Sequence, residues 1–262
     1  QDGGAASSPA EEVQRETACP TGMVRSGGKC TVPTPEKAYQ CTGEDPADCE
    51  RQCSRGDAGS CYFVAAMKET GRGMPQDYAR AAQLYDQTCR QGLAHACDRL
   101  GVMHFYGNGV QKDANKAVQL FLSGCKNGLA CGCNNLGFVL DVGRGVARDS
   151  AKASTLFRAA CNGGSVPGCF NAGVLADAGR GTPRDPQAAQ QLFQRAYQGG
   201  LVDEFRAGCA SGNAYSCFGL GYMHERGMFL PRDPVQARSY YQRSCPGVEW
   251  GCEALGRGAG PR

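Results

Sequence analysis

Cysteine is the residue type whose spacing in this chain most clearly indicates chemistry. Twelve of the seventeen cysteines fall into six pairs, spaced eight positions apart in the first five pairs and seven in the last. The pairs are Cys53 and Cys61, Cys89 and Cys97, Cys125 and Cys133, Cys161 and Cys169, Cys209 and Cys217, and Cys245 and Cys252. Thiols at this density, arranged in pairs, are typical of an oxidising compartment rather than the cytosol.

Catalytic chemistry has much weaker support. Ser26 and Lys29 match the S-x-x-K pattern of serine β-lactamases only in a glycine-rich loop, and the K-[ST]-G element is absent. The second element is matched at Ser211 only by accident of a turn. The three histidines are too few for metal hydrolysis, and no Ser-His-Asp signature is present. We therefore predict no catalytic residue, no metal ligand and no cofactor.

The cysteine pairs belong to a longer sequence repeat. Their first members step by 36 residues, except from Cys161 to Cys209, where the step is 48. Glycine recurs with the same period, and aspartate follows it by six positions. These residues are Gly71, Gly107, Gly143, Gly179 and Gly227, then Asp77, Asp113, Asp149, Asp185 and Asp233. A fixed period of this length predicts a solenoid of stacked units.

Each unit reads as helix, turn, helix. The glycine supplies the positive φ of a sharp helix exit, and the aspartate accepts amide hydrogens at the start of the next helix. That second helix carries alanine and, four positions later, an aromatic residue, so both lie on one face. In the first helix a small residue stands four positions after the second cysteine, which lets neighbouring helices approach closely.

The motif L-G-x-x-x-x-x-G-x-G-V-x-x-D followed by A-x-x-x-[YF] resembles the Sel1-like repeat, a relative of the tetratricopeptide repeat, over roughly residues 45 to 262. The added cysteines are similar to those of the cysteine-rich secreted subfamily known from Helicobacter. The resemblance implies an all-α fold, a right-handed α/α superhelical solenoid with an open concave face. It also implies that disulfides within the six pairs staple each repeat to its neighbour.

The repeat frame divides the chain into three parts. Residues 1–36 are predicted to be a flexible tether with a small disulfide loop, and residues 37–58 a capping helix region. Residues 59–262 hold five repeats and a C-terminal half-repeat cap. The first two parts contain two further predicted pairs, Cys19 with Cys30 and Cys41 with Cys49, although sequence alone cannot prove this connectivity.

Two features interrupt the regular pattern. Twelve extra residues near 198–209 predict a lengthened or broken second helix; the alternative is a docking ridge that includes Tyr197, Leu201, Val202 and Phe205. Cys131 is left over as a free thiol. An inert or exchanging thiol, an intermolecular bridge and a redox-active site all stay open for it.

Composition and charge limit the partners and the location. The net charge of +3, with no long basic or acidic run, gives no reason to expect nucleic acid or an anionic membrane surface. No stretch approaches the roughly 20 apolar residues of a membrane span. The polar opening segment is typical of a mature protein whose signal peptide has been removed, and a lipid anchor stays open. The Gly, Ala and Arg bias suggests a bacterial periplasmic, cell-surface or secreted protein.

The predicted function is a secreted or periplasmic, non-enzymatic scaffold or adaptor that binds a protein or peptide of the cell envelope through the solenoid surface. The alternative is a peptidoglycan- or penicillin-binding protein with weak β-lactamase-like activity, as described for the subfamily. The predicted contacts lie near the ends of the first helices and in the insertion. They are Lys68, Glu69, His104, Tyr106, Asp141, Asp177, Tyr222, His224 and Arg226, with Tyr197 and Phe205. Trp250, near the C-terminus, packs either on the previous unit or on a second copy, which leaves oligomerisation open.

Overall fold

The computed structural model of the chain describes residues 24–26, 29–31, 45–143, 145–245 and 248–256. Within these residues the chain forms thirteen helices and one antiparallel hairpin of two short strands, β1 Val24–Ser26 and β2 Lys29–Thr31. The helices are α2 Pro46–Ser54, α3 Ala58–Thr70, α4 Tyr78–Arg90, α5 Ala94–Tyr106, α6 Ala114–Lys126, α7 Ala130–Val142, α8 Ser150–Asn162, α9 Val166–Ala178, α10 Pro186–Gln198, α11 Leu201–Ala210, α12 Ala214–Arg226, α13 Pro234–Ser244 and α14 Glu249–Gly256. The repeat pattern did not indicate the short hairpin.

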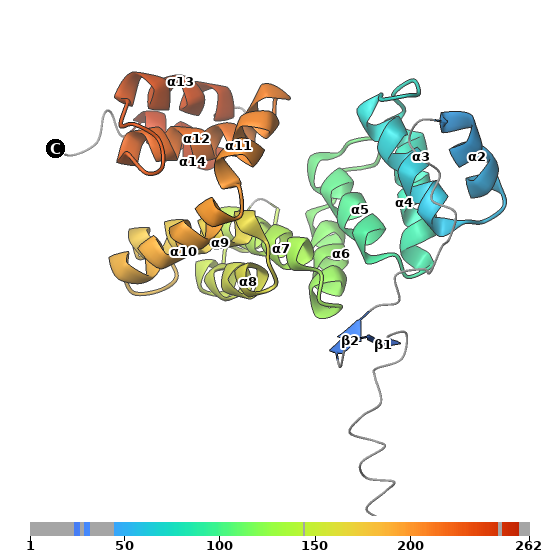
Figure 1. Cartoon of the computed structure of the whole chain (residues 1–262), viewed down its shortest axis with the longest axis horizontal. Coiled ribbons are helices and arrows are strands. Elements are labelled where there is room, and N and C mark those ends of the chain that lie inside the picture. Colours follow the sequence, from blue (N-terminus) through green and yellow to red (C-terminus); the bar gives the residue numbers. More distant parts are fainter. Residues whose placement is uncertain (1–23, 27–28, 32–44, 144, 246–247, 257–262) are drawn as a thin grey trace, which may run out of the picture.

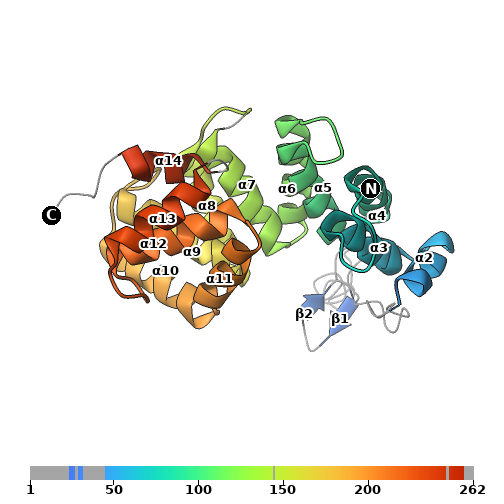
Figure 2. The ribbon, with the colours of Figure 1, turned by 90° about the horizontal axis from the view of Figure 1, so that it is seen from above.

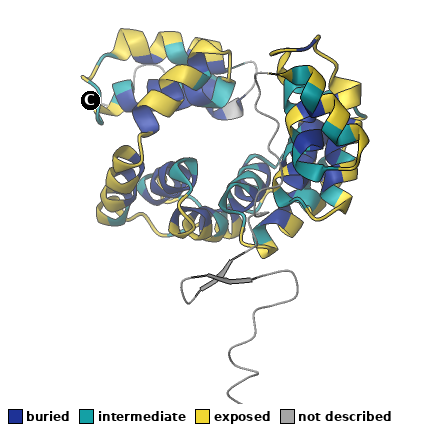
Figure 3. Cartoon of the chain, turned by 45° about the vertical axis from the view of Figure 1, so that its right-hand side comes forward, coloured by how far each residue is buried: buried dark blue, intermediate teal, exposed yellow. Residues whose placement is uncertain are grey.

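Consecutive helices pack against one another and build a solenoid (Figure 1 and Figure 2). Five hairpins follow the repeat frame: α3 with α4, α5 with α6, α7 with α8, α9 with α10, and α12 with α13. Helix α2 precedes the first hairpin and α14 follows the last. Buried residues lie between the packed helices, and the array bends along its length (Figure 3). The predicted all-α superhelical solenoid is confirmed.

The local signals act at the predicted helix ends. Each of the five repeated glycines ends a first helix with φ between 65° and 84°, the left-handed region that glycine adopts without strain. The aspartate six positions later caps the second helix; Asp149, for example, accepts a hydrogen bond from the backbone N–H of Lys152 at 2.9 Å. Inside the hairpin, a Cβ on Gly173 would lie 2.7 Å from the ring of Phe193, so this position must be glycine.

The second glycine of the turn has a different role. In the fourth unit, a Cβ on Gly181 would lie 2.1 Å from the carbonyl oxygen of Ser150, at the start of the preceding unit's second helix. The turn therefore packs directly on that backbone. In the fifth unit Phe229 takes this position and keeps a positive φ of 58°, and its ring stacks on Tyr197 with centroids 4.4 Å apart. The fifth turn packs on a different neighbour, which accepts an aromatic side chain.

All six predicted staples are formed. Each joins the end of one helix to the first turn of the next helix, as Cys161 in α8 does with Cys169 in α9, where the Cα atoms are 4.4 Å apart. The staples therefore fix neighbouring units to each other. Cys49 is also disulfide-bonded. The predicted pairings of the N-terminal cysteines involve residues outside the described part of the chain.

The insertion breaks the second helix of the fourth unit, as one of the two interpretations predicted. Helix α10 ends at Gln198, Gly200 follows with φ of 85°, and α11 begins at Leu201. The side chains of Leu201, Val202 and Phe205 are buried, whereas Tyr197 is 46% exposed. The prediction of a protruding docking ridge is therefore wrong for Leu201, Val202 and Phe205, because the apolar face of α11 packs into the core, whereas Tyr197 at the end of α10 stays exposed.

The last tryptophan packs within the chain. Trp250 in α14 is 3% exposed, and its ring lies 5.5 Å from that of Phe218 in α12 and 5.6 Å from that of Phe138 in α7 (centroid distances). The contact with α7 joins segments more than 100 residues apart in sequence. The C-terminal units therefore curve back toward the middle of the array.

Candidate functional site

One position of the repeat recurs in the first helix of every unit, and in the middle units it carries polar side chains. This position, two residues after the second cysteine, holds Phe63, Arg99, Asn135, Asn171 and Gly219. The preceding position adds Asp98 and Asn134. Because helices α5, α7 and α9 lie next to one another, these polar side chains from three units come together (Figure 1).

Four of them form a continuous chain of hydrogen bonds, which we call the amide ladder: Asp98, Asn134, Asn135 and Asn171. The amide of Asn171 donates to Asn134 at 2.9 Å, Asn134 donates to Asn135 at 3.5 Å, and Asn135 donates to Asp98 at 2.9 Å. The hydroxyl of Tyr215 donates to Asn171 at 2.6 Å. The ladder thus crosses α5, α7 and α9 and ends on α12.

A groove of about 220 Å³ runs beside the ladder. Its walls combine the ladder residues with aromatic side chains from three helices, Phe105, Tyr106, Phe138 and Tyr215. Asn134 and Asn135 are half-buried and line the groove, and beyond the ladder's own bonds each amide has one further N–H and one further lone pair. The surface is therefore apolar, with a row of groups that both donate and accept hydrogen bonds.

The insertion closes one end of this row. At the ladder position of the fifth unit stands Gly219, where a Cβ would lie 2.0 Å from the ring of Phe205. Phe205, from α11, therefore takes the space that a fifth ladder side chain would need. Tyr215 covers the same end through its bond to Asn171. The ladder residues are absent from the predicted contacts, although Asn135 and Asn171 recur at the repeat period of 36 residues.

Four of the predicted partner contacts are buried. The exposed fractions are 6% for His104, 0% for Asp141, 8% for Tyr222 and 1% for Phe205. The interpretation that they face outward is wrong for these side chains. His104, Asp141 and Tyr222 lie near the ends of first helices that pack inward at the turns, and Phe205 of α11 packs beside Gly219. Of the predicted contacts, Tyr106 lines the groove and is 47% exposed.

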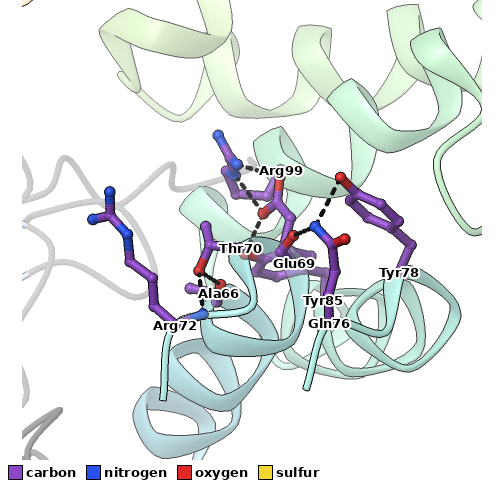
Figure 4. A network of polar contacts seen from close by, with 8 residues as sticks. All are labelled: Ala66, Glu69, Thr70, Arg72, Gln76, Tyr78, Tyr85 and Arg99. Atoms are coloured by element: carbon purple, nitrogen blue, oxygen red, sulfur yellow. Dashed lines mark hydrogen bonds and ion pairs between the residues drawn. The ribbon is translucent and has the colours of Figure 1, made fainter. Parts of the chain in front are cut away.

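Several predicted contacts instead hold neighbouring units together. Glu69 accepts hydrogen bonds from the hydroxyl of Tyr85 at 2.8 Å and from Nε of Arg99, in the next unit, at 3.2 Å, and Arg99 Nη2 bonds its other oxygen (Figure 4). Burial raises the pKa of the Tyr85 hydroxyl, and the negative charge of Glu69 adds to the increase. Tyr85 therefore stays protonated and donates to Glu69.

The same arrangement recurs two units further on. Asp141 accepts a hydrogen bond from Arg180 of the next unit at 2.6 Å. Asp177 accepts a hydrogen bond from the Tyr222 hydroxyl at 3.0 Å, and its carboxylate lies 3.2 Å from the guanidinium of Arg226. A carboxylate two positions before the glycine turn thus binds an arginine of the following unit. This pattern gives these acids a structural role, because each holds two neighbouring units together.

The remaining predicted contacts support the turns and the first helix. His104 Nδ1 lies 3.2 Å from the carbonyl oxygen of Gln111, and His224 Nδ1 lies 3.0 Å from that of Pro231. Lys68 lies 3.9 Å from Glu50. Ser26 and Lys29, considered above for catalysis, pair across the β1–β2 hairpin and are not on a helix. Within the described residues no group of three or more His, Cys, Asp and Glu side chains could hold a metal ion.

Cys131 carries a free, half-buried thiol beside Asp98. Burial and the negative charge of Asp98 raise the pKa of this thiol from 9.0 to about 11. Because the thiolate is the nucleophile, we expect alkylation by iodoacetamide near pH 8 to be about 100-fold slower than for an unperturbed cysteine, and to speed up about tenfold per pH unit toward pH 11. Mass spectrometry of the oxidised protein measures this rate.

The variant Asp98→Asn removes the neighbouring charge and is expected to lower the thiol pKa and increase the alkylation rate at pH 8. A rate for Cys131 in the original chain equal to that of a free cysteine peptide would contradict this prediction. The raised pKa disfavours the redox-active interpretation of Cys131.

A model of the Sel1 repeat matches residues 58–93, 94–129, 132–165, 166–201 and 214–245, about two thirds of the chain. The chain belongs to the Sel1 repeat family. Its disulfide-paired cysteines agree with the cysteine-rich, Helicobacter-like subfamily. Sel1 repeat proteins are generally protein-interaction scaffolds and generally non-catalytic. The match skips residues 202–213, which contain most of α11.

Solved structures share the fold. The chain is similar to c5321, a protective antigen of uropathogenic Escherichia coli with an SLR fold (TM-score 0.54, 27% identity, 79% of this chain and 50% of that chain). A Sel1 repeat protein from Oxalobacter formigenes matches with a TM-score of 0.53 and 20% identity over 81% of this chain and 89% of that one, which shows the fold alone. The chain spans half the length of the E. coli antigen. No curated protein sequence gives a significant match.

Two findings concern the cellular setting. The many disulfides indicate an oxidising environment outside the cytoplasm. In the described residues, none of the helices has both the length and the apolar character needed to cross a bilayer.

Proposed function

We propose that this protein is a secreted or periplasmic scaffold that binds an extended segment of another envelope protein in the groove beside the amide ladder. The ladder is the observation that carries the proposal. A side-chain amide offers one donor group and one acceptor, the same pair that each peptide unit of an extended backbone presents. Asn134 and Asn135, which are half-buried, would therefore complement a peptide backbone with little regard to its sequence. Asn171 is 1% exposed and holds the ladder in place through its bonds to Asn134 and Tyr215.

The aromatic walls supply the rest of the binding energy. Phe105 and Phe138 have centroids 6.1 Å apart in an edge-to-face contact, and Tyr106 stands exposed at the rim. Apolar side chains of a bound segment would be buried against these rings, since aromatic residues dominate the energetics of binding sites. The closed end at Tyr215 limits the row to the second, third and fourth units, so the bound segment is short.

The disulfides support the proposed location. Six staples are maintained only where reducing agents are scarce, which favours the periplasm, the cell surface or the exterior. The description of the E. coli neighbour as a protective antigen agrees with an exposed envelope location. A lipid anchor for the N-terminal segment belongs to the same proposal.

A peptide selection tests the function. Peptides displayed on phage are selected on the oxidised protein, and the affinity of the best binder is measured by fluorescence polarisation. We expect Asn135→Ala to weaken binding about tenfold, the effect of losing one or two hydrogen bonds to the backbone. N-methylation of a single backbone amide of the peptide is expected to weaken binding by a similar factor.

The matched control is Gln194→Ala, which removes an exposed amide on α10, outside the groove. It should leave the affinity unchanged. Selection of no peptide, or of peptides that bind Asn135→Ala and the original chain equally well, would exclude the groove. A thermal melt of each variant confirms that the fold is kept.

A further inference from the structure

A second and larger cavity lies at the C-terminal end of the array. It encloses about 590 Å³ between α9, α12, α13 and α14, within the range of small-molecule sites. Its apolar wall is made by four aromatic rings: Phe218, Tyr222, Tyr241 and Trp250. Trp250 also contacts Phe138 of the groove, so the two cavities are neighbours.

Two of the arginines that line this cavity are already neutralised by acids of the preceding units. Arg180 lies over the ring of Trp250, 4.8 Å from its centroid, and pairs with the fully buried Asp141. Arg226 lies over the ring of Tyr222, 5.6 Å from its centroid, and pairs with Asp177. Their charges leave little attraction for an added anion.

Three further charges line the same cavity: Glu225, Arg232 and Glu253. Glu225 stands two positions before the glycine turn, where Glu69, Asp141 and Asp177 each bind an arginine of the following unit. Glu225 accepts a hydrogen bond from the hydroxyl of Tyr241 at 2.6 Å. Across the described residues, none of the ion pairs involves Glu225, Arg232 or Glu253.

We propose that this cavity binds a zwitterionic ligand with an apolar body, a free amino acid or a very short peptide. Its ammonium group would neutralise Glu225 and Glu253, its carboxylate would bind the guanidinium of Arg232, and its side chain would pack on Phe218 and Tyr241. Within the described residues Glu225 lacks the arginine partner that the acids at this position have in three other units, so the ligand would supply the cation. This site is separate from the proposed peptide groove and does not depend on it.

Isothermal titration of the oxidised protein with the dipeptide alanyl-phenylalanine tests the proposal. The free dipeptide is expected to bind, whereas its N-acetyl and C-terminal amide forms, each lacking one charge, should bind about tenfold or more weakly. Arg232→Gln and Glu253→Gln should each weaken the binding of the free dipeptide by a similar factor. Both side chains are exposed, so the melting temperature should not change.

Two control variants locate the site. Arg238→Gln removes an exposed charge on α13 outside the cavity, and Asn135→Ala alters the groove; both should leave the dipeptide affinity unchanged. The proposal is overturned if the free dipeptide does not bind, or if its blocked forms bind as tightly. It is also overturned if Arg232→Gln has no more effect than Arg238→Gln, or if Asn135→Ala abolishes binding, which would place the dipeptide in the groove.

Discussion

Reduction of the disulfides is expected to unfold most of the repeat array. Each staple closes a loop of seven or eight residues and contributes on the order of 2 to 3 kcal/mol in the chain-entropy model. Six of them together contribute about 12 kcal/mol or more, comparable with the ~5–15 kcal/mol that keeps a typical domain folded. Far-ultraviolet circular dichroism during urea unfolding, with and without a phosphine reductant, measures the loss.

The position of a staple should decide how far the damage spreads. Replacing Cys245 and Cys252 by serine removes the last staple and should release mainly α14, because α14 is the last helix that the structure describes and this staple joins it to the end of α13. Replacing Cys161 and Cys169 removes a central staple and should lower the unfolding midpoint of the whole array. Equal midpoints for the reduced and oxidised protein would show that helix packing alone holds the array.

The variant Gly181→Ala is expected to be among the most destabilising single substitutions in the chain. The new Cβ would lie 2.1 Å from the carbonyl oxygen of Ser150, and the residue would keep a φ of 68°. Left-handed backbone costs a non-glycine residue about 1–2 kcal/mol, and a clash with fixed backbone adds about 1–3 kcal/mol. We expect a loss of ~3 kcal/mol or more in the free energy of unfolding, measured by urea titration.

The matched control separates these two causes. Gly164 has a φ of 90°, and a Cβ there would meet nothing within 4 Å. Gly164→Ala should therefore cost only the backbone part, about 1–2 kcal/mol. If both variants lose the same stability, the turn does not need close contact with the preceding unit, and the explanation given for Phe229 fails with it.

The repeat pattern did not show which polar residues of the first helices hold the units together and which line the groove. Acidic residues near the turns, such as Asp141 and Asp177, vary among units and so resemble recognition residues in sequence. The structure places them against arginines of the next unit. A position can therefore vary among units because its side chain pairs with a different partner in each neighbouring unit. Asn135 and Asn171 showed the opposite pattern, because the same polar residue stands at the same repeat position in two successive units.

The sequence by itself determined the units and their helix ends, and the cysteine spacing together with the family resemblance predicted the six disulfides. These features depend on contacts between residues close in the chain: a glycine with positive φ, an aspartate cap, and cysteines eight positions apart. The tertiary structure alone decided how α11 lies. Whether Leu201 and Phe205 protrude or pack inward depends on the space left beside Gly219, eighteen residues after Leu201.

The two cavities also belong to the tertiary structure. The groove brings together units two to five, and the C-terminal cavity lies between α9, α12, α13 and α14. Trp250 of α14 also contacts Phe138 of α7. Repeat periodicity gives the fold of one unit and its contact with the next, but small rotations between units accumulate along the array. Which distant side chains meet is set by that accumulated curvature and by the insertion, neither of which is encoded in any single repeat.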